Sequence, residues 1–166
     1  MGLALAVGVP LLQACGDDSS SGSGKPSATS PTSAPSANTY QLSAALDTHQ
    51  VVTPANKTWT PPAGIADATG TFSGVIDTRT GILDWQLDYT GLGKPALPIA
   101  DIHLGQRGRF GAVLVRLCGP CKASDSGTVQ VKPPARSVQL TSGNTWVTLL
   151  IDKYPNGAIR GQITAK

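Results

Sequence analysis

The feature of the sequence that most constrains its fold is a strict alternation of apolar and polar residues in GILDWQLDYTG, residues 81–91. Successive side chains of a strand point to opposite faces, so Leu83, Trp85, Leu87 and Tyr89 fall on one side of an extended chain. The residues between them are Asp, Gln and Asp. This pattern predicts a half-buried strand whose aromatic and aliphatic side faces a core.

Similar short segments recur along most of the chain and predict an all-β fold. Gly, Pro, Asn or Asp occupies nearly every gap between them, and these residues favour turns. All ten acidic residues are aspartates, and the chain has 19 Gly and 13 Pro, which disfavours long surface helices. We therefore expect an antiparallel β-sandwich or barrel. Its predicted strands are residues 40–46, 67–77, 81–90, 98–104, 111–117, 127–131, 136–140, 144–152 and 158–164.

Two tight hairpins are expected within this set. Residues 77–81 form a short loop that ends in Gly81, between two apolar stretches. Asn156 and Gly157 tolerate the positive φ values that a tight turn requires, so a second hairpin is predicted to turn there.

The first 39 residues predict export and attachment to a membrane. Residues 1–14 form an uncharged apolar run, which is typical of a signal peptide and too short to span a bilayer. The run ends in LQAC, which resembles the bacterial lipobox, where a signal peptidase cuts before a cysteine that is lipidated, here Cys15. Residues 15–39 are rich in Ser, Pro, Thr and Gly and predict a disordered tether. The folded domain is expected at residues 40–166, on the extracytoplasmic side of a bacterial cell envelope.

The charge pattern argues against nucleic acid as a partner. The chain has 13 basic and 10 acidic side chains, a formal net charge of +3. The basic residues are spread out, with no run and little aromatic interleaving, whereas nucleic-acid binders concentrate them.

The segment CGPC contains Cys118 and Cys121 at the spacing of thioredoxin-like redox enzymes. In those enzymes the first cysteine lies at a helix N-terminus, which lowers its pKa. Here KASDSG follows, and no βαβ pattern surrounds the motif. The two cysteines are therefore predicted to form a local disulfide in an oxidising compartment. Thiol exchange remains an alternative, and a zinc site would lack further cysteine ligands.

Asp101 and His103 are the candidate metal ligands, since residues two apart on a strand share a face. A third ligand would have to come from Asp152 or from His49, the other histidine in the chain. The simpler interpretation, which we favour, is a polar pair on the outward face of a strand whose inward face is filled by Ile102 and Leu104. No catalytic set of nucleophile and base is apparent in the sequence.

Three stretches of the chain together resemble the CHRD family, the module first known from chordin. They are PPAGIADATGTFSGVID at 61–77, DIHLGQRGRFGAVLVRL at 101–117 and LTSGNTWVTLLIDKYPNGAIRGQI at 140–163. The resemblance covers about residues 40–164. It implies a β-sandwich likened to the immunoglobulin-like barrel of copper/zinc superoxide dismutases, with no established enzymatic activity.

The sequence departs from the family pattern at possible metal ligands. Where the family often has His, Ile, His, this chain has Asp101, Ile102 and His103. Where many members have Asn, Val, His, Thr, residues 148–151 are Thr, Leu, Leu and Ile. The departures weaken any copper or zinc chemistry, because imidazole is the ligand that these metals favour.

Arg160 lies in the closing segment GAIRGQI, opposite the inward-facing Ile159 and Ile163. Its planar guanidinium suits a carboxylate or carbonyl partner. It is predicted to be a structural clamp that locks a neighbouring loop, for instance through an outward aspartate, with ligand binding as the alternative.

The sequence thus predicts a lipid-anchored envelope protein that performs no catalysis, needs no cofactor and binds or scaffolds an unidentified envelope protein. The alternatives are a dismutase-like copper or zinc protein using Asp101 and His103, and a thiol-exchange protein using Cys118 and Cys121.

Overall fold

The computed structural model describes residues 37–57, 59–93 and 97–166, and these residues form strands and two short 3-10 helices. The predicted signal peptide, Cys15 and all but the last residues of the predicted tether lie outside this part of the chain. The strands are β1 Thr39–Asp47, β2 Thr69–Asp77, β3 Ile82–Thr90, β4 Ile99–Leu104, β5 Val113–Cys118, β6 Ser124–Gln130, β7 Thr145–Ile151, β8 Tyr154–Gln162 and β9 Thr164–Ala165. The 3-10 helices are η1 Ala63–Ile65 and η2 Pro134–Thr141.

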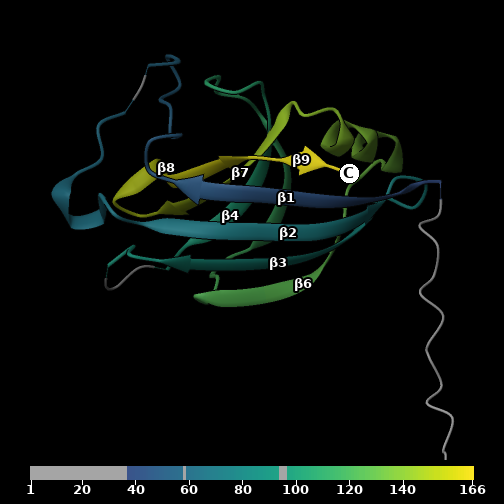
Figure 1. Cartoon of the computed structure of the whole chain (residues 1–166), viewed down its shortest axis with the longest axis horizontal. Coiled ribbons are helices and arrows are strands. Elements are labelled where there is room, and N and C mark those ends of the chain that lie inside the picture. The colour runs from purple at the N-terminus through teal and green to yellow at the C-terminus, as the bar shows by residue number, and fades with distance from the viewer. Residues whose placement is uncertain (1–36, 58, 94–96) are drawn as a thin grey trace, which may run out of the picture. The chain divides into compact units, whose positions relative to one another are not determined.

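One antiparallel sheet contains all of these strands, in the order β5-β4-β7-β8-β1-β2-β3-β6, with β9 added beside β1. The sheet curls into a nearly closed barrel. In Figure 1, β1, β2, β3 and β6 lie side by side as one wall, and β4, β7 and β8 form the wall behind. The predicted all-β antiparallel fold is confirmed.

The segment between β5 and β6 lies at the seam where the barrel stays open. Its backbone bonds both neighbouring strands: the Cys121 amide donates to the Pro98 carbonyl at 2.8 Å, and the Tyr89 amide donates to the Ala123 carbonyl at 2.9 Å. The Tyr89 hydroxyl also donates to the Cys121 carbonyl at 3.0 Å. The connection therefore holds the two edges of the sheet together without strand pairing.

The barrel interior follows from the alternation seen in the sequence. Leu83 and Leu87 are fully buried and Trp85 is 6% exposed. Trp85 pairs in register with Gly74 on β2 and Gly127 on β6, so no side chain stands beside the indole on either strand. A Cβ at Gly127 would lie 3.1 Å from the Trp85 ring, which explains why glycine fits there. Each large apolar side chain buried in this way contributes roughly 1.5–3 kcal/mol.

The predicted strand at 136–140 is wrong, because this segment is the 3-10 helix η2. Pro134 begins the helix, where its fixed φ is favourable and its missing N–H is not needed. A 3-10 helix brings residues three apart onto one face, and Ser137 and Leu140 are the two that are buried. The Ser137 hydroxyl donates to the Thr78 carbonyl, while Val138 stays 55% exposed.

The first predicted hairpin is confirmed and the second is misplaced. β2 ends at Asp77 and β3 begins at Ile82, with Gly81 at φ +74°. The second turn lies at 152–153, and Asn156 and Gly157 are part of β8. Gly157 has φ +118°, and a Cβ there would lie 2.7 Å from the Thr148 hydroxyl. Glycine is thus required by a close approach of β8 to β7 instead of by a turn.

No helix within the described residues is long and apolar enough to cross a membrane.

Candidate functional site

The outer face of β4, β7 and β8 brings together side chains that are far apart in the sequence. In the register of the sheet, Asp101 on β4 lies opposite Arg116 on β5 and Thr148 on β7, and Thr148 lies opposite Arg160 on β8. In the adjacent row, His103 pairs with Trp146. We call Asp101, His103, Trp146, Thr148 and Arg160 the outer cluster.

Asp101 and His103 lie on the outward face of β4, as predicted, but this face is not open to solvent. Their side chains point away from the barrel interior, as expected, yet Asp101 is 3% exposed and His103 is 6% exposed. Residues 105–112, which we call the cover loop, fold back over this face. The Gly111 carbonyl contacts the His103 ring, and the Phe110 ring lies 6.2 Å from that of Trp146. Burial by a loop, and not by the second wall of the barrel, removes this polar pair from water.

Two glycines let the cover loop approach the strands this closely. A Cβ on Gly111 would lie 1.5 Å from the Leu104 carbonyl oxygen, which is inside any permitted contact. A Cβ on Gly105 would lie 2.8 Å from the Trp146 indole nitrogen, and Gly105 has φ +151°. The loop therefore needs glycine at both positions to cover the outer cluster.

Asp101 forms an ion pair with Arg116. The Arg116 Nε donates to one carboxylate oxygen at 2.9 Å and Nη2 donates to the other at 3.3 Å. This bidentate geometry fixes both groups. The hydrogen bond and charge of Asp101 raise the pKa of Arg116. Both oxygens of the candidate metal ligand are thus already engaged.

His103 stacks on Trp146 and is held in one tautomer. The ring centroids are 4.1 Å apart with the planes at 11°. Nδ1 of His103 lies 2.9 Å from the Gly111 carbonyl, and because a carbonyl can only accept, Nδ1 carries the proton. Burial lowers the pKa of His103, against smaller opposing effects from Gly111 and Asp101. The imidazole is therefore neutral near pH 7, and its Nε2 is buried without a hydrogen-bond partner among the described residues.

The described residues do not offer a complete set of ligands for copper or zinc. No group of three or more His, Cys, Asp or Glu side chains in residues 37–57, 59–93 and 97–166 is close enough to hold one ion. The Asp101 carboxylate is bound to Arg116, so His103 Nε2 is the one atom of the predicted pair that is available to bind a metal. A tetrahedral site needs three protein ligands or more. The residues present therefore do not fit the dismutase-like metal of the sequence hypothesis.

Arg160 is buried without the carboxylate partner that the sequence led us to expect. It is 2% exposed, and its guanidinium carbon lies 3.8 Å from the centroid of the Trp146 ring. Nη2 donates to the Gln106 carbonyl at 3.4 Å, and Nη1 has no partner among the residues that the structure describes. The ion pairs within the described part of the chain are Arg116–Asp101 and Arg79–Asp77. Arg160 thus contacts the cover loop through the Gln106 carbonyl and packs on Trp146 of β7.

Cys118 and Cys121 are joined by a disulfide, as predicted. No helix follows Cys121, because β6 begins at Ser124. The arrangement lacks the helix dipole that activates a thioredoxin-like cysteine. A loop this short restrains little of the unfolded chain, so the bond contributes at most about 2 kcal/mol.

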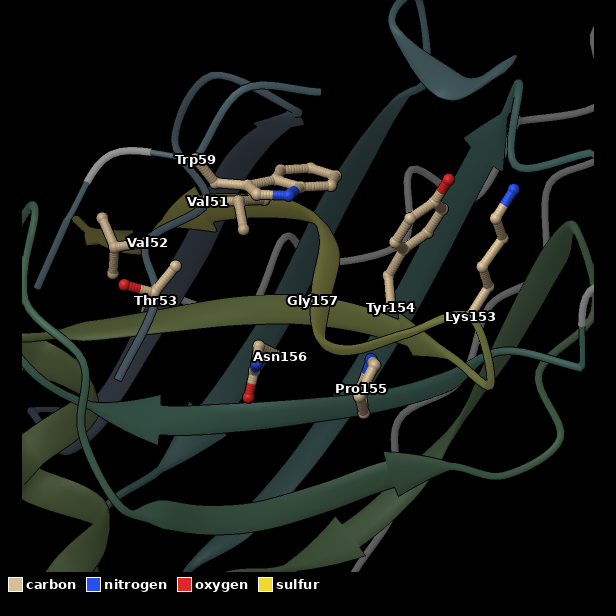
Figure 2. A pocket seen from close by; sticks show the side chains of 9 residues that line it. All are labelled: Val51, Val52, Thr53, Trp59, Lys153, Tyr154, Pro155, Asn156 and Gly157. Carbon is tan, nitrogen blue, oxygen red and sulfur yellow. The ribbon is translucent and has the colours of Figure 1, made fainter. Parts of the chain in front are cut away.

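A second feature, missed by the sequence reading, is an apolar pocket beside the β7–β8 turn. It has a volume of about 190 Å³. Figure 2 shows the indole of Trp59 and the phenol ring of Tyr154 above the ribbon of β8, with Lys153 at one side. The two rings meet edge to face with centroids 5.4 Å apart, and the Lys153 ammonium lies 5.6 Å from the Tyr154 ring. The wall is completed by Val51, Val52, Thr53, Pro155, Asn156 and Gly157.

Some of these residues could have been found from the sequence and others could not. Val147 and Leu149 alternate inward on β7, which places Trp146 and Thr148 on the outer face. The sequence does not show that β4 pairs with β7, which is not its neighbour along the chain, so alternation alone would not have assembled the outer cluster. Trp59 lies in an irregular segment before η1, where no period assigns a direction to the side chain.

The described residues form an antiparallel β-barrel module with a loop-covered polar cluster on one wall. The family model described as "CHRD domain" matches residues 42–163. The match spans well over half of the chain and nearly the whole barrel, so the chain belongs to the CHRD domain family. Comparisons with curated proteins and with solved structures each found no significant match.

Proposed function

We propose that this chain is a lipid-anchored CHRD protein of the cell envelope, which binds a partner protein through the Trp59–Tyr154 pocket and catalyses no reaction. The observation that carries the proposal is the pocket itself. Its two aromatic rings are only half-buried and have apolar neighbours, while polar groups such as Lys153 and Asn156 stand at its edge. Trp and Tyr in this arrangement dominate the binding energy of many protein interfaces.

The size of the pocket favours a protein partner over a small-molecule ligand. Sites for drug-sized ligands usually have volumes of about 300–1,000 Å³. At about 190 Å³ the pocket has room for one apolar side chain of a partner. The mixture of an apolar centre and a polar rim is also typical of protein interfaces.

Attachment to the membrane is supported by the LQAC segment and the Ser- and Pro-rich residues that follow Cys15. The disulfide between Cys118 and Cys121 fits an oxidising compartment. Replacing Cys15 by Ala should release the protein from the membrane fraction, since a lipid on this residue would be its anchor. Unchanged membrane association of the variant would contradict the proposed lipidation.

The partner site can be tested by photocrosslinking in intact cells. A photoreactive amino acid at Asn156, on the pocket wall, should give a discrete adduct with one envelope protein. The same group at Ser126, which is exposed on β6, serves as the matched control and should not give this adduct. Trp59→Ala should abolish the adduct, whereas Val138→Ala, at an exposed apolar residue of η2, should leave it unchanged. An adduct that is insensitive to Trp59→Ala would refute the pocket as the binding site.

The absence of catalysis has its own test at the disulfide. Purified protein should not accelerate insulin reduction by dithiothreitol, because no helix dipole stabilises a thiolate at Cys118 or Cys121. Rates that exceed those of the Cys118→Ser/Cys121→Ser variant would instead support thiol exchange.

A further inference from the structure

A second pocket lies over the outer cluster, between the cover loop and the loop that follows β1. Its volume is about 230 Å³, and its lining includes His49, Gln50, Arg107, Arg160 and Gln162. At about 30 Å³ per water molecule, it has room for roughly seven waters. This is enough for a small ion with part of its hydration shell.

Arg160 forms part of the wall of this pocket and lacks an anionic partner. A buried guanidinium is costly to desolvate unless an anion and a full set of hydrogen bonds compensate it. Trp146 covers one side of the group, and the Gln106 carbonyl accepts a long bond from Nη2. Nη1 is left unpaired among the described residues. A buried donor of this kind requires a hydrogen-bond acceptor from outside the chain.

A second cationic side chain, Arg107, lines the same pocket as Arg160. Burial and the charge of Arg107 lower the pKa of Arg160 to about 10, so its guanidinium is still charged at neutral pH. The neighbouring carboxylate in register, Asp47 on β1, accepts bonds from the Gln50 amide at 2.9 Å and from Gln50 Nε2 at 2.7 Å. It makes no ion pair with Arg160. Two positive charges thus face the pocket while the nearby acid is engaged elsewhere.

Gln162 supplies an acceptor at the same pocket. Its Nε2 donates to the carbonyls of Gly143 at 2.8 Å and Gly105 at 3.2 Å, which fixes the orientation of the amide. Its Oε1 is buried and has no donor among the described residues. Arg160 Nη1 needs an acceptor and Gln162 Oε1 needs a donor, and an oxyanion that carries a hydroxyl supplies both while also balancing the charge of the guanidinium.

We propose that this pocket binds a small oxyanion that carries a proton, such as hydrogen phosphate. Arg160 and Arg107 bind its anionic oxygens, and Gln162 Oε1 accepts a hydrogen bond from its hydroxyl group. This pocket shares Val52 with the wall of the Trp59–Tyr154 pocket, but none of its proposed ligand-binding residues lines that pocket, so the two proposals are tested independently.

The direct test is a titration of the full chain with inorganic phosphate near pH 7, followed by NMR at the indole N–H of Trp146, which contacts Arg160. We expect saturable binding with a Kd at or below about 1 mM. Sulfate has the same shape and no proton at this pH, so it should bind about tenfold more weakly or worse. No saturable shift with phosphate, or equal binding of sulfate, would overturn the proposal.

Variants assign the binding to these residues. Arg107→Gln changes an exposed side chain of the cover loop and should weaken phosphate binding about tenfold. Arg109→Gln is the matched control, because Arg109 is an exposed arginine of the same loop that does not line the pocket, and it should bind as the wild type does. Arg160→Met should abolish binding. If Arg160→Met does not fold, comparing the phosphate affinities of Arg107→Gln and Arg109→Gln still tests the site. Equal affinities of those two variants would refute it.

A further arm separates free phosphate from membrane phosphate. Vesicles of phosphatidylmethanol present an anionic phosphodiester whose headgroup has no hydroxyl to donate to Gln162. They should therefore not displace inorganic phosphate from the full chain, whereas displacement by these vesicles would refute the requirement for a proton on the ligand.

Discussion

The strands of both barrel walls have polar residues on their outer faces, but these residues are exposed to solvent on one wall and buried on the other. On the wall of β2, β3 and β6, the register row Ser73, Gln86 and Ser126 is exposed to solvent. On the wall of β4, β7 and β8, the row of His103, Trp146 and Gln162 is buried or half-buried. The strands alternate in both walls, so alternation alone does not say whether a polar outer residue meets water.

The difference comes from loops. The connection before β6 is short, and the helix η2 in the connection after it contacts β1, β2 and β9. The cover loop and residues 48–57 instead reach across the outer face of β7 and β8. They are joined there by a hydrogen bond from the Phe110 amide to the Asn56 side chain at 2.8 Å. Polar groups beneath them must find partners within the protein, since an unpaired buried donor or acceptor costs about 1–3 kcal/mol. Substitutions on the covered wall should therefore have large effects on stability, and its unpaired polar groups are available to bind ligands.

The largest contrast between the walls is expected from their central outer side chains. Trp146→Ala should lower the free energy of unfolding by about 3–5 kcal/mol, because it removes a buried ring that contacts both His103 and Arg160. Gln86→Ala on the exposed wall should change it little. Urea denaturation of both variants measures the difference. Equal effects would mean that the cover loop does not seal the outer cluster in solution.

A second contrast tests the loop itself. Gly111→Ala should cost about 2 kcal/mol or more, because its Cβ would overlap the Leu104 carbonyl and force the cover loop to move. Gly64→Ala is the control, since a Cβ at Gly64 meets nothing within 4 Å. Thermal unfolding compares the two. A Gly111→Ala variant as stable as Gly64→Ala would show that the loop can lift from the strands without loss.

The third contrast compares an ion pair on each wall. Arg116→Ala leaves the buried Asp101 carboxylate unpaired and should destabilise the protein by about 2 kcal/mol. Arg79→Ala breaks a pair whose arginine is 74% exposed, and its effect should lie within the error of the measurement. Adding Asp101→Asn to Arg116→Ala should restore part of the lost stability, because the uncompensated charge is then gone. Failure to restore any would contradict burial of that charge.

The fold was largely predictable from the sequence, and its exceptions have physical causes. Period-two alternation found β3 with its inward residues Leu83, Trp85 and Leu87. The alternation rule failed at η2. Ser137, Val138, Gln139 and Leu140 alternate in polarity by chance, while the preceding prolines favour the start of a helix. It also failed at Gly157, since a glycine needed for close strand approach has the same letter as a glycine needed for a turn.

The candidate site was predictable only in part. The sequence placed Asp101 and His103 on one face and Arg160 opposite the core, and both placements hold. It could not show that the cover loop buries them, because burial from outside the barrel depends on where residues 105–112 travel in space. It also gave Arg160 an aspartate partner, whereas the nearby Asp47 bonds to Gln50. Such a choice between partners depends on distances of a few ångströms that a pattern does not encode.

The smallest expected effect is a pH dependence of the folding stability, which arises from His103 on the covered wall. The groups around the His103 ring are Asp101 on its own strand, Arg160 from β8 and the Gly111 carbonyl from the cover loop. Burial outweighs the effects that favour the charged form, so it lowers the pKa of His103 below the ordinary histidine value of about 6.5 in the folded state. As the pH falls below about 6.5, the unfolded chain binds a proton that the folded chain does not, so stability must fall with the pH.

This effect can be isolated with His103→Phe, which keeps an aromatic ring against Trp146 and removes the titrating group. Free energies of unfolding from urea curves at pH 7.5, 6.5 and 5.5 should decrease more steeply for the wild type than for His103→Phe. The matched control is His49→Ala, which removes the exposed imidazole of the loop after β1 and should keep the wild-type slope. A His103→Phe slope equal to that of the wild type would mean that His103 is hydrated in the folded protein, and the two walls would then differ less than their burial indicates.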